Sequence, residues 1–94
     1  MYPFDIAGIV KGVDTTKNGQ IYYSVLTTRD VRCGGPKHYL IAVFPSMPAA
    51  SCTVGKHAKA SGTYFYDCFE GANGIGRVCM AELGYKQDAA LTCH

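Results

Sequence analysis

The chain has no segment in which apolar residues recur at the spacing of an amphipathic helix over ten residues. Short runs rich in β-branched and aromatic residues alternate instead with clusters of Gly, Pro, Asn and Asp. This pattern predicts an all-β protein. The 94 residues fit one domain, and the 48% of hydrophobic residues suffices for a single small core.

Five strands are expected. Asn18-Gly19 is a strong turn signal between the first two, which should form a hairpin, and Pro45 should end the third. Gly62 should make a bulge or a bend within the fourth. The expected strands are residues 4–13, 20–29, 37–44, 58–67 and 77–85, with a flexible connector at 70–76 and a frayed tail at 86–94.

Five antiparallel strands in a chain of this size have to protect their edges, and a small closed barrel does so economically. We expect one domain over 1–94, with the barrel at about 4–85 and a short C-terminal tail. Alternation along each strand assigns side chains to two faces. Inward residues are expected to be Ile6, Gly8, Val10, Ile21, Tyr23, Val25, Tyr39, Ile41, Val43, Ala58, Ala60 and Tyr64. Large outward residues are expected to be Tyr22, Leu26, His38, Leu40, Phe44 and Phe65.

The five cysteines are predicted to be free thiols. Their odd number and the lack of a visible signal peptide favour a reducing cytosol, so a cytoplasmic location is expected. Cys68 and Cys79 could face each other across a hairpin, but spacing alone does not make them a disulfide. The longest apolar run, residues 39–44, is far too short for a membrane span.

An ordered set of short motifs resembles a known family. The motifs are Ile6-Ala7-Gly8-Ile9-Val10, then His38-Tyr39-Leu40-Ile41-Ala42-Val43-Phe44, then Val54-Gly55-Lys56-His57-Ala58-Lys59-Ala60-Ser61-Gly62, and finally Met80-Ala81-Glu82-Leu83. Over residues 4–85 this succession is similar to the bacterial single-stranded DNA-binding proteins and primosomal replication protein B. The resemblance implies a five-stranded OB-fold barrel that binds single-stranded nucleic acid. The chain departs from the family in having no Trp and only a short segment, 45–53, in place of a helix.

Candidate binding residues come from this resemblance and from strand alternation. Phe44 matches the stacking Phe of the third strand, His38 falls at the position of its Trp, and Phe69 lies near an aromatic position after the fourth strand. Outward alternation adds Phe65 and Tyr22 as rings on which bases can stack. Candidate phosphate-binding cations are Lys11, Arg29, Arg32, Lys37, Lys59 and Arg77.

The leading hypothesis is a cytoplasmic homodimer that binds single-stranded DNA with little sequence preference. RNA and replication proteins are further candidate partners, and DNA replication, recombination or plasmid and phage maintenance are candidate pathways. One alternative is an OB-fold module that binds another protein through its outward apolar residues; another is an RNA-binding barrel of the cold-shock type. We expect no catalytic activity, no metal and no cofactor, because Asp67 and Glu70 flank a turn and the histidines lack a nucleophile or ligand set.

Overall fold

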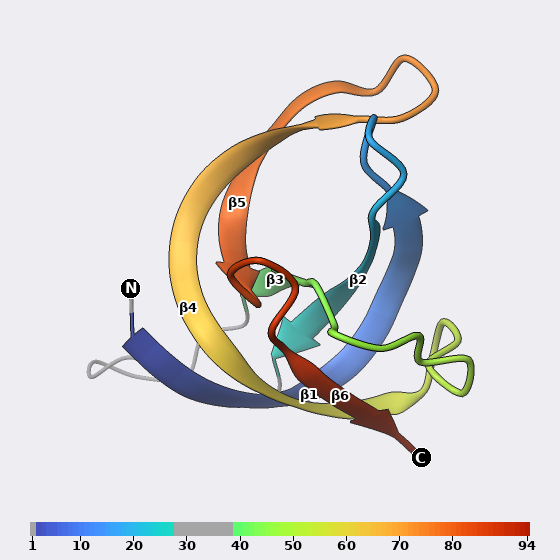
Figure 1. Ribbon diagram of the computed structural model, residues 1–94. Helices are drawn as coiled ribbons and strands as arrows, with labels where there is room; N and C mark the ends of the chain where they lie inside the picture. Colours follow the sequence, from blue (N-terminus) through green and yellow to red (C-terminus); the bar gives the residue numbers. More distant parts are fainter. Residues whose placement is uncertain (1, 28–38) are drawn as a thin grey trace.

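The computed structural model describes residues 2–27 and 39–94, and every regular element in these residues is a β-strand (Figure 1). The all-β prediction is therefore confirmed. The strands are β1 (Tyr2–Thr15), β2 (Ile21–Thr27), β3 (Leu40–Val43), β4 (His57–Gly71), β5 (Gly76–Leu83) and β6 (Ala90–Cys93).

Five of the strands close into a ring in the order β1-β2-β3-β5-β4, and β4 pairs back onto β1. All pairs are antiparallel except β3 and β5, which run parallel where Ala42 faces Glu82 and Val43 faces Leu83. This arrangement confirms the predicted five-stranded barrel. Each of the five strands in the ring pairs with two neighbours, so no strand of the ring has an edge that is free along its whole length. Protection of strand edges is the advantage expected of a closed barrel.

The barrel interior holds one main core, and alternation predicted most of it. Buried residues of this core include Ile6, Val10, Tyr23, Val25, Ile41, Val43, Ala58, Ala60 and Leu83, with Tyr39 and Tyr64 partly buried against it. The prediction for Ile21 is wrong, since this residue is 44% exposed at the start of β2.

The expected frayed tail is corrected by a sixth strand. Residues Ala90–Cys93 pair with β4 from Ala58 to Ser61, outside the five-stranded ring.

The bulge expected at Gly62 lies instead between Val10 and Gly12 of β1. A glycine at position 62 lets β4 approach the segment before β6 closely, because a Cβ there would lie only 3.0 Å from the Cα of Ala89.

Four of the five cysteines form two disulfides, Cys52–Cys93 and Cys68–Cys79. The free-thiol prediction, on which the expected reducing compartment rested, is therefore wrong for these four; Cys33 lies outside the described residues. The first disulfide ties β6 to the segment before β4. The second joins directly opposite residues of β4 and β5.

The hairpin arm, which we define as residues 65–82 of β4 and β5 with their loop, curves away from the barrel and returns to it (Figure 1). Its tip meets the β1–β2 turn. There the amide of Lys17 donates to the carbonyl of Glu70 at 2.8 Å, and the amide of Ala72 donates to the carbonyl of Thr15 at 3.2 Å. The predicted flexible connector is thus a short hairpin loop held by a second hairpin.

Replacing Gly8 by Ala is expected to destabilise the barrel by about 1–3 kcal/mol or more, the range for overpacking. A Cβ at Gly8 would overlap the backbone carbonyl oxygen of Leu26 in the paired strand β2, where the backbone cannot give way cheaply. Gly12 of the same strand is the matched control, because a Cβ there meets only the Asp14 carboxylate oxygen at 3.5 Å. Urea unfolding of both variants measures the difference, and equal stabilities would contradict the packing described here.

Candidate nucleic-acid interface

Three of the predicted stacking residues form an aromatic cluster: Tyr22, Phe44 and Phe69. The ring centroids of Tyr22 and Phe69 lie 4.9 Å apart, those of Tyr22 and Phe44 5.4 Å, and those of Phe44 and Phe69 5.5 Å. The two pairs that include Phe69 are edge-to-face and the Tyr22–Phe44 pair is tilted, and such offset arrangements are favourable at these distances. Ala42 and Met80 complete this second, smaller core.

The aromatic cluster lies on the side of β2 and β3 that faces away from the barrel interior, as alternation predicted. The expected exposure is nevertheless wrong for two of its rings, because Tyr22 is only 5% exposed and Phe44 only 6%. The hairpin arm places Phe69 and Met80 over them. Burial, together with the negative charge of Asp14, raises the pKa of the Tyr22 phenol.

Beside the aromatic cluster lies a groove of about 220 Å³, called here the aromatic groove. Phe65 and Tyr85 line it as an edge-to-face pair with centroids 5.6 Å apart. The ammonium of Lys86 lies 5.5 Å from the centre of the Tyr85 ring. The full lining is Gln20, Phe44, Phe65, Asp67, Cys68, Phe69, Glu82, Gly84, Tyr85, Lys86 and Gln87.

The aromatic groove therefore brings together Phe44, Phe65 and Phe69 of the predicted site, and it adds two residues that sequence reasoning missed. Tyr85, 40% exposed, offers the most accessible ring of the lining, and Lys86 offers the cation. The sequence carried one signal for them, an aromatic residue directly before a lysine in a polar turn after β5.

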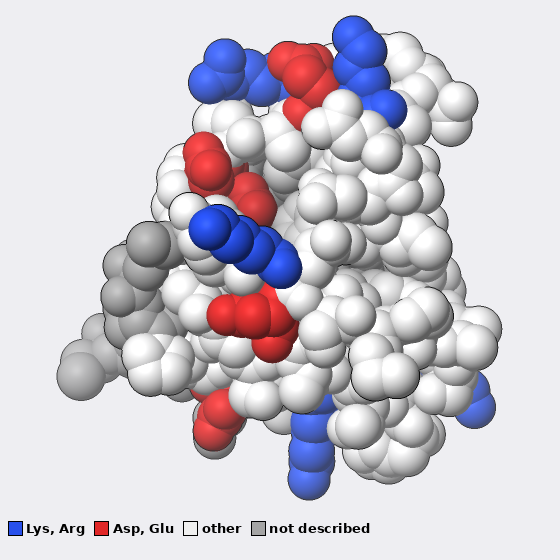
Figure 2. All heavy atoms as spheres, in the orientation of Figure 1, with Lys and Arg blue, Asp and Glu red and all other residues white. Residues whose placement is uncertain are grey.

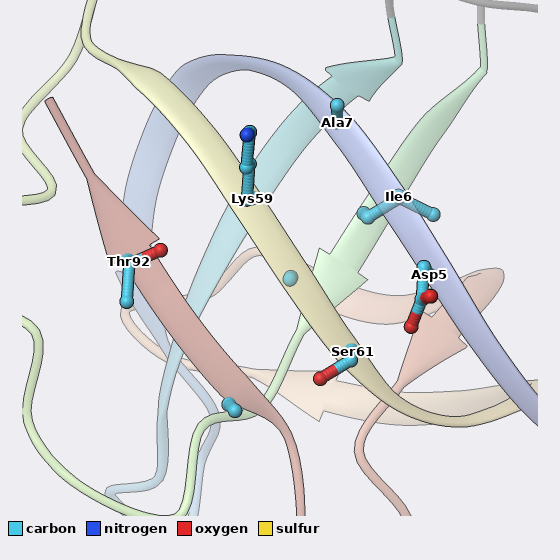
Figure 3. Close-up of a pocket in the computed structure, with 8 residues that line it drawn as sticks. Asp5, Ile6, Ala7, Lys59, Ser61 and Thr92 are labelled. Atoms are coloured by element: carbon cyan, nitrogen blue, oxygen red, sulfur yellow. The ribbon is translucent and has the colours of Figure 1, made fainter.

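The predicted cations that the structure describes, Lys11, Lys59 and Arg77, do not line the aromatic groove. Lys59 lines a different depression of about 490 Å³ on the outside of β1, β4 and β6, where Figure 3 shows it beside Ala7 and Thr92, with Asp5 further along. Lys11 is exposed on β1, and Arg77 is exposed on β5 opposite Glu70. His38, Arg29, Arg32 and Lys37 lie outside the described residues.

Charge on the face seen in Figure 2 is mixed. Acidic and basic groups lie side by side over β4 and β5, while much of the rest of that face is uncharged. The protein as a whole carries a net charge of +2. Among the residues that the structure describes, this face therefore has no continuous basic stripe that could bind a phosphate backbone by charge alone.

Glu82 is the unusual polar residue of the aromatic groove. It is 6% exposed, and its Oε2 atom is buried without a hydrogen-bond partner among the described residues. Burial, and secondarily the negative charge of Asp67, raise the pKa of the Glu82 carboxyl from its ordinary 4.5 to about 7. The Glu82 carboxyl therefore keeps its proton to a higher pH than an ordinary glutamate does.

No family model matches the sequence, and no curated protein matches it. Among solved structures, the chain is similar to a Plasmodium falciparum SSB in complex with ssDNA. The similarity covers 100% of this chain and 95% of the other, with a TM-score of 0.52 and 14% sequence identity. A likeness at this identity concerns the fold, and it supports the predicted OB-fold relationship; the primosomal part of the predicted resemblance stays a prediction.

Metal and membrane features are not found in the described part of the chain. In residues 2–27 and 39–94, no three His, Cys, Asp or Glu side chains come together as metal ligands. The same residues include no helix long and apolar enough to cross a bilayer.

The stability of the protein should fall as pH rises from about 4.5 to about 7, in part because of Glu82. The native carboxyl keeps its proton in this interval while the unfolded one loses it, so the folded state binds more protons and is favoured at lower pH. We expect a contribution on the order of 2 kcal/mol, allowing for screening by water at the groove mouth.

Glu82→Gln should remove this contribution, because an amide does not titrate in the interval. Urea unfolding of both proteins at the two ends of the interval measures it as the change in their stability difference. An unchanged difference would show that the Glu82 carboxyl has an ordinary pKa.

Proposed function

We propose that the protein binds single-stranded nucleic acid, DNA in the first place, with the aromatic groove as its contact surface. The observation that carries this proposal is the open pair of rings, Phe65 and Tyr85, next to Lys86 on an OB-fold barrel. Support comes also from the fold shared with an SSB whose structure was solved in complex with ssDNA.

The two parts that a single-strand binder needs are both found at the aromatic groove. Rings accept bases by stacking, which is worth about 1–3 kcal/mol per base and tolerates any sequence. A lysine close to the ring can reach the phosphate that follows a stacked base. Because the surface charge is mixed, stacking should contribute more to the affinity than phosphate contacts do.

The cellular role is proposed from the sequence resemblance. It comprises DNA replication, recombination or mobile-element maintenance in the cytoplasm, without catalysis and with replication proteins as partners. The two disulfides are more typical of an oxidising compartment. A thiol count on protein isolated directly from its host under alkylating conditions decides the compartment: five free thiols support the cytoplasm, and one supports an oxidising location.

Tyr85→Ala should weaken binding to a dT oligonucleotide by about 1–3 kcal/mol, the value of one stacked base. Tyr66→Ala is the matched control: Tyr66 is 71% exposed on the hairpin arm but does not line the aromatic groove, so its loss should leave the affinity unchanged. Fluorescence anisotropy measures both. The protein should also bind dT far better than a blunt duplex of equal length.

Lys86→Ala should lower the magnitude of the slope of log affinity against log salt by about 0.7, as one released counterion does on a single strand. Lys59→Ala provides the comparison, since Lys59 lies in the outer depression of Figure 3. Equal affinity for dT and duplex, or a larger salt effect of Lys59 than of Lys86, would contradict the proposed surface.

A second candidate function is protein binding, and exposed apolar side chains favour it. Met47 is 74% exposed and Ile21 44%, and both line a depression of about 270 Å³ that also includes Pro45 and Pro48. Apolar side chains gathered in this way often mark an interface. We propose that this depression is the contact of a homodimer, whose two binding surfaces would gain affinity by avidity.

Met47→Glu should convert such a homodimer to monomers, because it would place a charge at the centre of the apolar contact. Sedimentation equilibrium at micromolar concentration measures the mass of both proteins. A wild-type mass equal to the 10.1 kDa of one chain would overturn the dimer.

A further inference from the structure

We propose that Glu82 reads the edge of one base in the aromatic groove and selects a base that carries an amino group beside an unprotonated ring nitrogen, as cytosine does. This inference rests on the proposed function of the same surface. It adds a sequence preference at a single position to binding that is otherwise tolerant of sequence.

The position of Glu82 is the first step of the argument. Within the sheet it faces Phe65 of β4 on one side and Ala42 of β3 on the other, so its side chain shares the face of the rings. It lines the aromatic groove together with Phe65 and Tyr85. A base stacked against these rings would therefore lie beside Glu82, whose side chain would have to turn toward the groove to meet the edge of the base.

The unpaired oxygen of Glu82 is the second step. Buried polar atoms nearly always have a partner, because leaving one unpaired costs free energy. The Oε2 atom is buried and has no partner among the described residues. A ligand that supplies the missing hydrogen bond would be favoured over one that does not.

The size of the aromatic groove is the third step. At about 220 Å³ it is smaller than the sites that hold drug-sized ligands. It is therefore suited to a single ring system, such as one base of a longer strand. The rest of the strand would pass outside it, past Lys86.

The protonation state of Glu82 determines which edge it can read. A neutral carboxyl offers one donor and one acceptor side by side. Cytosine presents the complement, since its N4 amino group donates and its N3 accepts, and sharing the proton with N3 makes both hydrogen bonds charge-assisted. The O4 atom of thymine is a weaker proton acceptor than this nitrogen, so thymine gains less from the same group.

Other titratable groups also face this site, and the test has to separate them from Glu82. They are Asp67 from β4, Tyr22 from β2, and Tyr85 and Lys86 from the segment after β5, while Ala42 of β3 and Phe44 directly after β3 carry no titratable group. Two variants do so. Glu82→Gln keeps one donor and one acceptor without a titratable proton, and Glu82→Met keeps the length of the side chain without either.

The experiment measures the affinity for a dT oligonucleotide with a single central dC against the all-dT oligonucleotide of equal length. For the wild-type protein we expect a preference for the dC strand of roughly tenfold at about pH 5.5, as one bidentate base contact provides. The preference should approach one at about pH 8.5, where the ionised carboxylate no longer has a proton to donate.

The two variants should each differ from the wild type in how the preference for the dC strand depends on pH. Glu82→Gln should give a ratio of the two affinities that does not change with pH and that is smaller than the wild-type ratio at about pH 5.5, and Glu82→Met should show no preference at either pH. A wild-type protein that binds both strands equally well at about pH 5.5, or a Glu82→Met variant that keeps the preference, overturns the role of Glu82. A wild-type protein that does not bind the all-dT strand overturns the proposed function itself.

Discussion

The contact between the tips of the two hairpins determines how much of this protein is available for binding. Two backbone hydrogen bonds join the β1–β2 turn to the end of the hairpin arm, from Lys17 to Glu70 and from Ala72 to Thr15. They hold the arm against the outer side of β2 and β3. Without this contact Tyr22 and Phe44 would face solvent, as they do in the arrangement that strand alternation predicts.

Closure of the arm explains why the candidate surface is a groove rather than an open sheet face. The rings of the aromatic cluster fill the space between arm and barrel, so the ribbons in Figure 1 enclose packed side chains. Phe65 and Phe69 stay partly accessible, and Tyr85 is the exposed ring beside them. A ligand that stacks here meets a preformed pair of rings.

Glu82 shows that the aromatic groove is not optimised for stability. An apolar residue beside Phe65 and Ala42 would remove the cost of an unpaired oxygen and of a carboxyl that resists ionisation. Binding of a base that pairs with Glu82 would offset part of that cost, since a ligand that binds only the folded state stabilises it.

The barrel could be predicted from the sequence because its interior follows a period of two. Ile6, Val10, Val25, Ile41 and Val43 are buried as alternation requires. Alternation assigns a side chain to one side of a strand, but it does not say what covers that side. For Phe44 the cover is the hairpin arm, and the predicted end of the fourth strand at residue 67 left out the part of β4 that carries Phe69.

Other features depend on contacts between distant parts of the chain, which no local pattern encodes. The partner of Cys52 is 41 residues away on a strand that looked like a tail, so the pairing follows only from the folded barrel. The unusual environment of Glu82 could have been predicted, since alternation along β5 puts this charged residue on the same face as the apolar residues Val78 and Met80. The pKa of its carboxyl, however, depends on Asp67 of the neighbouring strand.

The distribution of cations has a consequence for how a strand could run over the surface. Lys86 lies at the aromatic groove, whereas Lys59 lies in the outer depression formed by β1, β4 and β6. The chain runs from Lys86 past Ala89 into β6, which pairs with β4 and is joined by the Cys52–Cys93 disulfide to the segment before β4. A single strand that stacks on Tyr85 therefore gains little from Lys59, and among the described residues Lys86 is the cation that lines the aromatic groove. Affinity at such a surface has to come mainly from base stacking on the rings and from hydrogen bonds to base edges. A groove that holds one base beside Glu82 therefore contributes more to the affinity than a row of phosphate contacts does.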